Sequence, residues 1–320
     1  MNPAPFTEVT LDLADRRVGK VRVSYALPED RRLFVTTDRL SAFDQIIAGV
    51  PWKGQVLNQL AAWWFEQTAD VVSNHISALP ASVQAQPDPN VTIAVAARPL
   101  PVEVIVRGHI TGVTGTSLWR RYADGARTIY GYEFPDGLRK NTELPAPIIT
   151  PTTKGEAGRH DEALTCAEVT ERGLVTPALW DEVQAAALAV FDRGRQVAAA
   201  AGMILADTKY EFGLAPDGAL LLIDEVHTPD SSRFWLADSY EQRLGASDEP
   251  ESLDKEVIRR ALADAGYTGD GPPPTLDPVV WDATTARYIA AYERITGRRF
   301  EPGEYPVAPR LAGNVAGWLR

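Results

Sequence analysis

The most constraining feature of this chain is a pair of neighbouring strand-like segments, residues 204–213 and 221–233, that both carry acidic side chains. The sequence Pro216-Asp217-Gly218 between them is typical of a hairpin turn. Because successive side chains of a strand point to opposite faces, Lys209 and Glu211 are expected to share one face. The sequence therefore predicts an antiparallel hairpin with a charged face.

This hairpin is expected to bring Glu211 close to Asp224 or Glu225. Two carboxylates beside a lysine can hold Mg²⁺ through hard oxygen ligands, while the ammonium group of Lys209 meets phosphate as a point charge. A surface hairpin with solvated charges is the structural alternative. Residues 228–233, Thr-Pro-Asp-Ser-Ser-Arg, add hydroxyls and a guanidinium directly after the acidic pair, and this density of polar groups favours a metal-nucleotide site.

The composition is that of an ordinary globular chain. Its 320 residues are 45% hydrophobic and 23% charged, enough to build one large or two moderate cores, and two linked lobes are expected. The net charge of −11 argues against non-specific nucleic-acid binding, so an anionic substrate must meet local lysines and arginines. A single cysteine, Cys166, excludes an intrachain disulfide framework and fits a reducing compartment.

The sequence also predicts where the protein resides. No segment approaches the length of a membrane span, so no membrane partner is expected. Residues 1–6 lack a charged leader followed by an apolar stretch. We therefore expect a cytoplasmic protein.

The first lobe is predicted to span residues 1–97 and to be rich in β-structure. Two strand-like runs, residues 20–25 and 32–37, flank a charged turn and predict a hairpin. Apolar residues at helical spacing over residues 57–68 predict an amphipathic helix whose aromatic stripe lies in the core. Residues 49–55 before it are interpreted as a tight loop.

The larger second lobe, residues 98–320, is predicted to mix helix and strand. It begins with an alternating strand over residues 100–107, and residues 180–201 predict a long helix before the acidic hairpin. Two further helices are expected over residues 252–265, where Ser252 would be the N-cap, and over residues 277–296. The predicted fold class is therefore α/β (α+β), with a helical C-terminal part.

Two glycine-containing motifs carry residue types suited to anionic ligands. Gly19-Lys20-Val21-Arg22 places two cations at the start of the first hairpin, where they can cover phosphates. Arg107-Gly108-His109-Ile110-Thr111-Gly112, together with hydroxyls up to Ser117, suits a phosphate or a carboxylate. A purely structural hairpin start and a glycine-rich bend are the alternatives. His109 alone does not make a catalytic base, because a lone histidine near a turn more often makes a structural hydrogen bond.

Two further polar stretches also have structural alternatives. Residues 37–44 follow a buried-looking strand, a common place for binding residues, but a local cap in which Asp38 satisfies backbone amides is the favoured interpretation. Residues 151–162 are dense in charge, and Lys154, His160 and Asp161 can close around an anionic substrate. A solvent-facing loop is the alternative there. One cysteine and scattered histidines do not supply a tetrahedral zinc site.

Taken in order, these motifs resemble those of the phosphoribosylaminoimidazole-succinocarboxamide synthases, also called SAICAR synthetases, of purine biosynthesis. The resemblance rests on residues 19–22, 37–44, 100–107, 150–154 and 160–162, and on both strands of the acidic hairpin. It implies a two-lobed fold related to kinase-like and ATP-grasp-like proteins, with the nucleotide between the lobes and covered by residues 1–97. The implied reaction is ATP-dependent ligation of L-aspartate to carboxyaminoimidazole ribonucleotide, which yields SAICAR, ADP and phosphate.

The same resemblance implies roles for particular residues. The residues implied to contact the ATP phosphates or to organise the nucleotide and Mg²⁺ are Lys20, Arg22, Lys209, Glu211 and Asp224, with Glu211 and Asp224 as metal ligands. The residues implied to bind the other substrates are Asp44, Arg107, Ser117, Lys154, Asp161 and Arg233. Lys209, Glu211, Asp224 and Asp161 are the implied catalytic set. The sequence after Thr111-Gly112 departs from the family pattern, so Thr114 and Thr116 compete with Ser117 as the phosphate-binding hydroxyl.

The mechanistic hypothesis is that the substrate carboxylate attacks the γ-phosphoryl group of ATP and that the aspartate amine then attacks the resulting acyl phosphate. A small-molecule kinase that stops after phosphoryl transfer is one alternative. A regulatory protein that binds nucleotide without chemistry is another. The oligomeric state stays open between monomer and homodimer.

Overall fold

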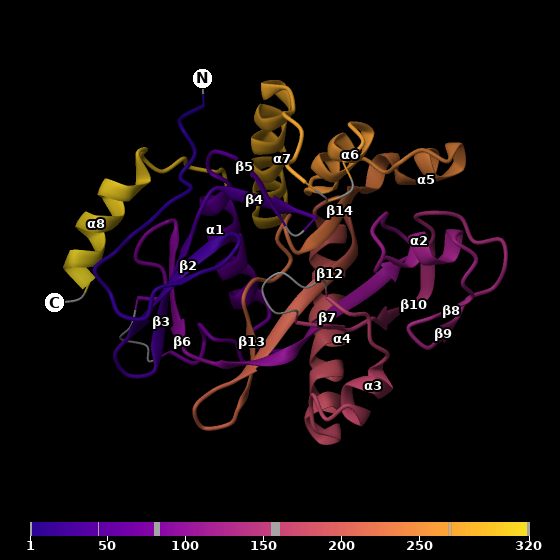
Figure 1. Ribbon diagram of the computed structural model, residues 1–320, viewed down its shortest axis with the longest axis horizontal. Helices are drawn as coiled ribbons and strands as arrows, with labels where there is room; N and C mark the ends of the chain where they lie inside the picture. The colour runs from indigo at the N-terminus through magenta and orange to yellow at the C-terminus, as the bar shows by residue number, and fades with distance from the viewer. Residues whose placement is uncertain are drawn as a thin grey trace.

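The computed structural model describes residues 2–43, 45–79, 84–154, 161–267, 269 and 271–318. Over this part of the chain, the backbone forms a four-stranded sheet, a six-stranded sheet and two two-stranded ribbons. The two large sheets lie side by side, with helices packed around them (Figure 1). The predicted mixture of helix and strand is confirmed.

The first sheet contains the predicted N-terminal hairpin. Its strands in spatial order are β1 (Arg17–Val18), β2 (Arg22–Leu27), β3 (Arg31–Thr36) and β6 (Val91–Val95), all antiparallel. Alternate residues of β2 and β3, among them Val23, Tyr25 and Leu33, face a core of their own. This alternation turns Arg22, the first residue of β2, away from that core, and Arg22 forms ion pairs with Asp224 and Glu225.

The second sheet contains the predicted acidic hairpin. Its path is β10 (Glu143–Ile149), β7 (Arg98–His109), β12 (Met203–Leu214) and β13 (Leu220–Ile223), with β11 (Thr152–Thr153) on β7 and β14 (Ser232–Leu236) on β12. β12 and β13 pair antiparallel with Glu211 opposite Ile223, which confirms the hairpin. Tyr210 and Phe212 on β12 and Val104 on β7 enter the main core, so the charged residues between them face away from it.

Helices pack around the sheets, and several of them contribute residues to this main core. They are α1 (Lys53–Gln67), α2 (Leu118–Ala123), α3 (Cys166–Glu171), α4 (Pro177–Ala200), α5 (Ala237–Ala246), α6 (Glu256–Asp264), α7 (Pro278–Thr296) and α8 (Val307–Trp318). The remaining strands form the ribbons β4 (Arg39–Ala42) with β5 (Gln45–Gly49) and β8 (Thr128–Ile129) with β9 (Tyr132–Glu133). The expected helix over residues 277–296 is confirmed, and Asp277 caps it by accepting the N–H of Val279 at 2.9 Å.

Two predicted helix starts were wrong, each for a tertiary reason. α1 begins at Lys53 rather than residue 57, because the Asp38 carboxylate accepts the Gly54 N–H at 2.9 Å from a distant part of the chain. α6 begins at Glu256, and its N-terminal carboxylate is Asp254, which accepts the Glu256 N–H at 2.7 Å. Ser252 instead forms a bridge to Trp235 of β14.

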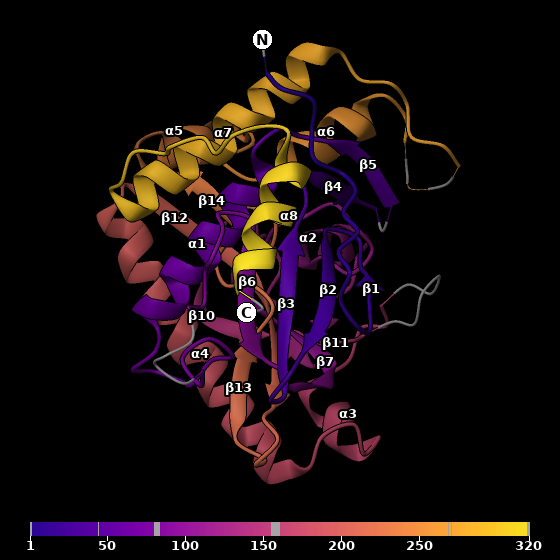
Figure 2. The same cartoon turned by 90° about the vertical axis from the view of Figure 1, so that its left-hand side faces the viewer.

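The C-terminal segment packs against both cores. α7 places Tyr288, Tyr292 and Ile295 in the main core beside α1. α8 places Val307 and Leu311 in the core of the first sheet, and Figure 2 shows it lying in front of β3 and β6. The division into lobes at residue 97 stays a prediction. None of the described helices is both long enough and apolar enough to cross a membrane.

Candidate functional site

A cavity of about 600 Å³ lies where the two sheets meet. Its walls come from residues 19–22 before and at the start of β2, from the charged face of β7 and β12, and from the loop between β13 and β14. Lys255 and Arg259 at the start of α6 close another side. The cavity therefore collects residues from many separate stretches of the sequence, between Gly19 and Arg259.

The charged face of the cavity is set by the pairing of β7 with β12. Alternation along β12 directs Asp207, Lys209 and Glu211 to one face. The antiparallel register places Arg107 opposite Asp207 and Glu103 opposite Glu211. As a result, one end of this face gathers carboxylates and the other end gathers guanidinium groups.

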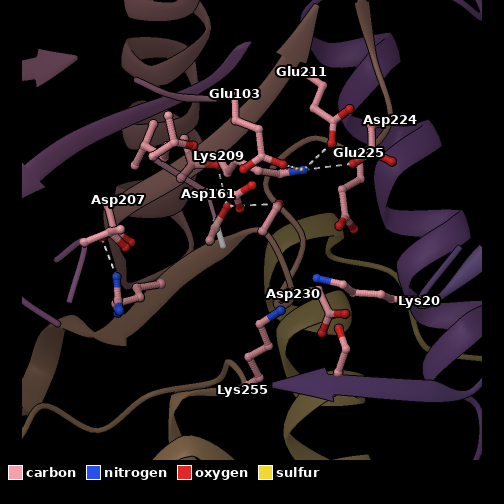
Figure 3. Close-up of a pocket in the computed structure, with 18 of the residues that line it drawn as sticks. Lys20, Glu103, Asp161, Asp207, Lys209, Glu211, Asp224, Glu225, Asp230 and Lys255 are labelled. Atoms are coloured by element: carbon pink, nitrogen blue, oxygen red, sulfur yellow. Dashed lines mark hydrogen bonds and ion pairs between the residues drawn. The ribbon is translucent and has the colours of Figure 1, made fainter. Parts of the chain in front are cut away.

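Lys209 is the centre of the carboxylate-rich end (Figure 3). Its Nζ lies 2.5 Å from Glu211 Oε1, 3.2 Å from Asp224 Oδ2 and 3.6 Å from Glu103 Oε1. Burial opposes the charge of Lys209, but these three carboxylates outweigh burial and raise its pKa well above the ordinary value. Lys154 forms an ion pair with the other oxygen of Glu211. Lys209 is therefore charged at neutral pH.

Arg22 joins the first sheet to this end of the cavity. It forms ion pairs with Asp224 and with Glu225, the latter at 3.3 Å between Nη2 and Oε2. Burial disfavours the ionised form of Asp224, but Arg22 and Lys209 outweigh it and hold the pKa of Asp224 below the ordinary range. Burial raises the pKa of Glu225, against the opposing effect of Arg22. The acidic pair thus contains one firmly ionised carboxylate and one that is easier to protonate.

Two arginines flank a single aspartate at the other end. Asp207 Oδ2 lies 2.5 Å from Arg233 Nη1 and 3.3 Å from Arg107 Nη1. Arg107 also donates to Thr150 Oγ1 at 2.8 Å and to the Thr116 carbonyl at 3.2 Å. These bonds hold both planar guanidinium groups in defined orientations, as recognition of a phosphate or carboxylate requires.

A glycine brings the loop after β7 close to Arg233. Gly112 has φ of +94°, and a Cβ there would lie 2.5 Å from Ser117 Cβ and 3.1 Å from Arg233 Nη2. Ser117 Oγ donates to the Thr114 carbonyl at 2.6 Å. Thr114, Thr116 and Ser117 all line the cavity, so all three competing residues border the arginine end.

The structure gathers nearly all of the predicted site residues. Lys20, Arg22, Arg107, Ser117, Lys154, Asp161, Lys209, Glu211, Asp224 and Arg233 line the one cavity. Asp44 and His160 lie outside the described residues. The individual roles of all these residues stay predictions.

Two residues interpreted from the sequence as structural do have structural contacts, but not the local ones expected: Asp38 satisfies amides of distant residues, and the contacts of His109 are with aromatic rings. His109 is buried against Trp235 and Tyr240, and burial lowers its pKa to about 4, so it is a neutral packing residue. Asp38 accepts the backbone N–H groups of Phe6 at 2.7 Å and of Gly54 at 2.9 Å. Neither side chain belongs to the cavity lining.

Sequence reasoning missed five charged residues of the cavity: Glu103, Asp207, Asp230, Lys255 and Arg259. Side chains an even number of positions apart on a strand share a face, so Lys209 would have indicated Asp207, and Arg107 would have indicated Glu103. No periodic signal marks Asp230 or Lys255, because one lies in a loop and the other precedes a helix. Burial lowers the pKa of Lys255 to about 8, against the opposing effect of Asp230.

The site fits Mg²⁺ together with a bound polyphosphate. No group of three or more His, Cys, Asp or Glu residues that could hold a metal occurs among the residues that the structure describes. Glu211 and Asp224 offer carboxylate oxygens, and each oxygen already faces a lysine or arginine. Because Mg²⁺ is commonly held by one or two carboxylates plus substrate phosphates, this pair fits Mg²⁺ together with a polyphosphate.

Comparisons with known proteins agree on one family. The model of the SAICAR synthetase family matches residues 16–274, which include every residue that lines the cavity. A phosphoribosylaminoimidazole-succinocarboxamide synthase of Legionella pneumophila (strain Lens) is 45% identical over 323 residues, covering 99% of each chain. A putative phosphoribosylaminoimidazole-succinocarboxamide synthase 2 of Agrobacterium fabrum is 47% identical over 91% of this chain and 90% of its own. The Saccharomyces cerevisiae SAICAR synthase complexed with SAICAR has a TM-score of 0.78 and 33% identity, covering 92% of this chain and 99% of its own.

Proposed function

Because the chain belongs to the SAICAR synthetase family, we propose that its cavity binds ATP, carboxyaminoimidazole ribonucleotide and L-aspartate and joins the last two. The chain is a carbon-nitrogen ligase of purine biosynthesis whose product is SAICAR. In this proposal, each end of the cavity binds the phosphate groups of a different substrate. The bacterial relatives of the chain support a cytoplasmic location, which is part of the same proposal.

The observation that carries the proposal is the presence of two different anion-binding arrangements in one cavity. At the arginine end, Arg107 and Arg233 present planar forks around Asp207, an arrangement suited to a phosphate monoester. At the carboxylate end, cations and carboxylates alternate around Lys209, an arrangement suited to a metal-bound polyphosphate. A ribonucleotide and ATP need these two arrangements within reach of each other.

We assign the ATP phosphates to the carboxylate end. Lys20, Arg22 and Lys209 line the cavity and would contact phosphate oxygens when ATP binds, and Arg22 and Lys209 would exchange carboxylate partners for them. Glu211 and Asp224 would then be available to hold Mg²⁺. When bound, Mg²⁺ supplies neutralisation of the charge on the transferring phosphoryl group.

We assign the ribonucleotide phosphate to Arg107 and Arg233, with a hydroxyl of the loop that ends at Ser117. Asp161 lies between the labelled Asp207 and Lys209 in the view of Figure 3, and Lys154 lines the same cavity. These two residues would contact the imidazole substrate or L-aspartate. Asp161 would position the aspartate amine or accept its proton. These assignments bring the substrate carboxylate toward the γ-phosphoryl group.

The chemistry then needs alignment more than it needs a protein nucleophile. A carboxylate oxygen of the substrate attacks the γ-phosphorus and ADP leaves, which forms an acyl phosphate. The aspartate amine attacks the acyl carbon, the carbon-oxygen bond to phosphate breaks, and the amine loses a proton as the amide forms. The protein's tasks are to align the reactants and to exclude water, which would otherwise hydrolyse the acyl phosphate.

The test is an ADP-release assay that contains ATP, Mg²⁺, carboxyaminoimidazole ribonucleotide and L-aspartate, each omitted in turn, with the product mass measured. We expect SAICAR only when all components are present. ADP release without L-aspartate would instead indicate a kinase or an uncoupled ATPase. Nucleotide binding without any turnover would indicate a regulatory protein.

A further inference from the structure

Three buried polar side chains form a connected group at the wall of the cavity. Asp230, in the loop between β13 and β14, forms an ion pair with Lys53 at 2.7 Å between Oδ2 and Nζ. Its other oxygen accepts the hydroxyl of Tyr288 at 2.5 Å. The side chains of Lys53 and Asp230 are 0% and 3% exposed, and Tyr288 is fully buried. The group therefore ties the loop to the start of α1 and to the middle of α7.

Tyr288 is the unexpected member of this group. α7 begins at Pro278, beyond residue 274 where the family match ends. Burial and the neighbouring Asp230 raise the pKa of Tyr288 well above its ordinary value, so its hydroxyl keeps the proton that it donates. A helix outside the matched segment thus supplies a hydrogen bond to a residue that lines the cavity.

The energetics of the group point away from a role in stability alone. Moving an ion pair out of water costs free energy that its mutual attraction only partly returns, so a buried pair is weak evidence for stabilisation. What the group does provide is a single orientation for Asp230, since both carboxylate oxygens have a fixed partner. Burial disfavours the charge of Asp230, but Lys255, Lys53 and Tyr288 outweigh burial and hold its pKa below the ordinary range.

The orientation of Asp230 bears directly on the reacting end of the cavity. The next residue, Ser231, lines the cavity, and its carbonyl accepts the backbone N–H of Lys209 at 2.9 Å. Asp230 also lies beside Lys255, and Figure 3 shows the two side chains together below the Lys209 group. The loop that carries Asp230 therefore contacts the backbone of Lys209 directly and helps to set the position of Lys209 in the cavity.

We propose that Tyr288 is a positioning residue of the ligase reaction, which acts by holding Asp230 and, through it, the loop that supports Lys209. The inference rests on the proposed function, because alignment of ATP by Lys209 is part of that proposal. Tyr288 does not line the cavity itself. It contacts Asp230, which does, and holds the Asp230 carboxylate in place. Its effect should therefore appear in turnover rather than in substrate binding.

The test compares Tyr288→Phe with Tyr292→Phe. Tyr292 lies one turn along the same helix, is buried against Phe300, and among the described residues its hydroxyl makes no hydrogen bond. We expect Tyr288→Phe to lower kcat about tenfold with each KM within about twofold, since misalignment reduces the rate without removing a binding contact. Tyr292→Phe should keep wild-type kcat and KM.

A second variant shows whether Tyr288 acts through Asp230. Adding Tyr288→Phe to Asp230→Asn should cause no further loss of kcat, because the hydroxyl then has no carboxylate to orient. Wild-type kcat in Tyr288→Phe, or an equal loss in Tyr292→Phe, would overturn the inference even if Asp230→Asn fails to fold. The unmodified enzyme is measured in the same assay. If it forms SAICAR and Tyr288→Phe has the same kcat, the inference about Tyr288 fails while the proposed function stands.

Discussion

The two ends of the cavity use the same residue types in opposite proportions. At one end, Glu103, Glu211, Asp224 and Glu225 surround Lys209 and Arg22. At the other, Arg107, Arg233 and Arg259 share the carboxylates of Asp207 and Glu256. Excess carboxylate attracts a further cation, whereas excess guanidinium attracts an anion. Two ends of one cavity can thus prefer ligands of different charge: one suits a metal-bound polyphosphate, and the other suits a phosphate monoester.

The largest expected effect tests the carboxylate end. Lys209→Met removes the cation that Glu211, Asp224 and Glu103 share, so these partly buried carboxylates repel each other and ATP loses a phosphate partner. We expect kcat/KM for SAICAR formation to fall about 10³-fold. Lys209→Arg, which keeps the charge, should lose less. Near-normal turnover by a folded Lys209→Met enzyme, with folding checked by thermal unfolding, would show that this end is not where ATP reacts.

The next effect tests the arginine end. Arg233→Lys keeps the charge but loses the fork that pairs with Asp207 and Glu256. We expect KM for carboxyaminoimidazole ribonucleotide to rise about 100-fold, with KM for ATP nearly unchanged. Arg243→Lys, at an ion pair on α5 outside the cavity, is the matched control. A rise confined to the KM for ATP would reverse the assignment of the two ends.

A smaller effect separates metal binding from general charge at the carboxylate end. Glu211→Gln removes a carboxylate that we assign to Mg²⁺, so the Mg²⁺ concentration for half-maximal rate should rise about tenfold. Glu103→Gln is the matched control, because Glu103 also lies near Lys209 but is not assigned to the metal. Titration of Mg²⁺ at saturating ATP measures both variants. An equal shift in the two variants would mean that only total charge matters.

The smallest effect concerns Lys255, which lines the cavity beside Asp230. Burial lowers its pKa to about 8, so the side chain is charged below that pH and neutral above it. If its charge helps to hold an anionic substrate, kcat/KM should decline as the pH rises through about 8. Lys255→Arg should move this decline to higher pH, because a guanidinium stays charged. The same decline in both enzymes, measured over about pH 6 to 9.5, would assign it to another group.

Much of the candidate site could be predicted because its signals are local. The period of two on β12 and the turn at Pro216-Asp217-Gly218 depend on residues close in sequence, and the structure has both. The position of Asp230 could not be predicted in this way. Its partners Lys53 and Tyr288 are 177 and 58 residues away, and no pattern in the sequence links them.

Helix starts likewise divide into those that local sequence predicts and those that distant contacts decide. Asp277 caps α7 from the adjacent position, and that start was predictable. The start of α1 was not, because the first turn is fixed by Asp38 and by the close approach of Gly54 to the Thr36 carbonyl, where a Cβ would lie at 2.5 Å. Local chemistry places an element, but distant contacts decide where it begins.

By itself, the sequence determined the charged face of β12, the hairpin that follows it and the family to which the chain belongs, because alternation, turn chemistry and motif order are all carried by neighbouring residues. Only the tertiary structure decided that Arg107 lies opposite Asp207 and that Arg22 reaches Asp224 from another sheet. Strand register and the packing of one sheet on another depend on how the whole core fills its volume. The separation of the cavity into two ends is therefore a property of the folded chain.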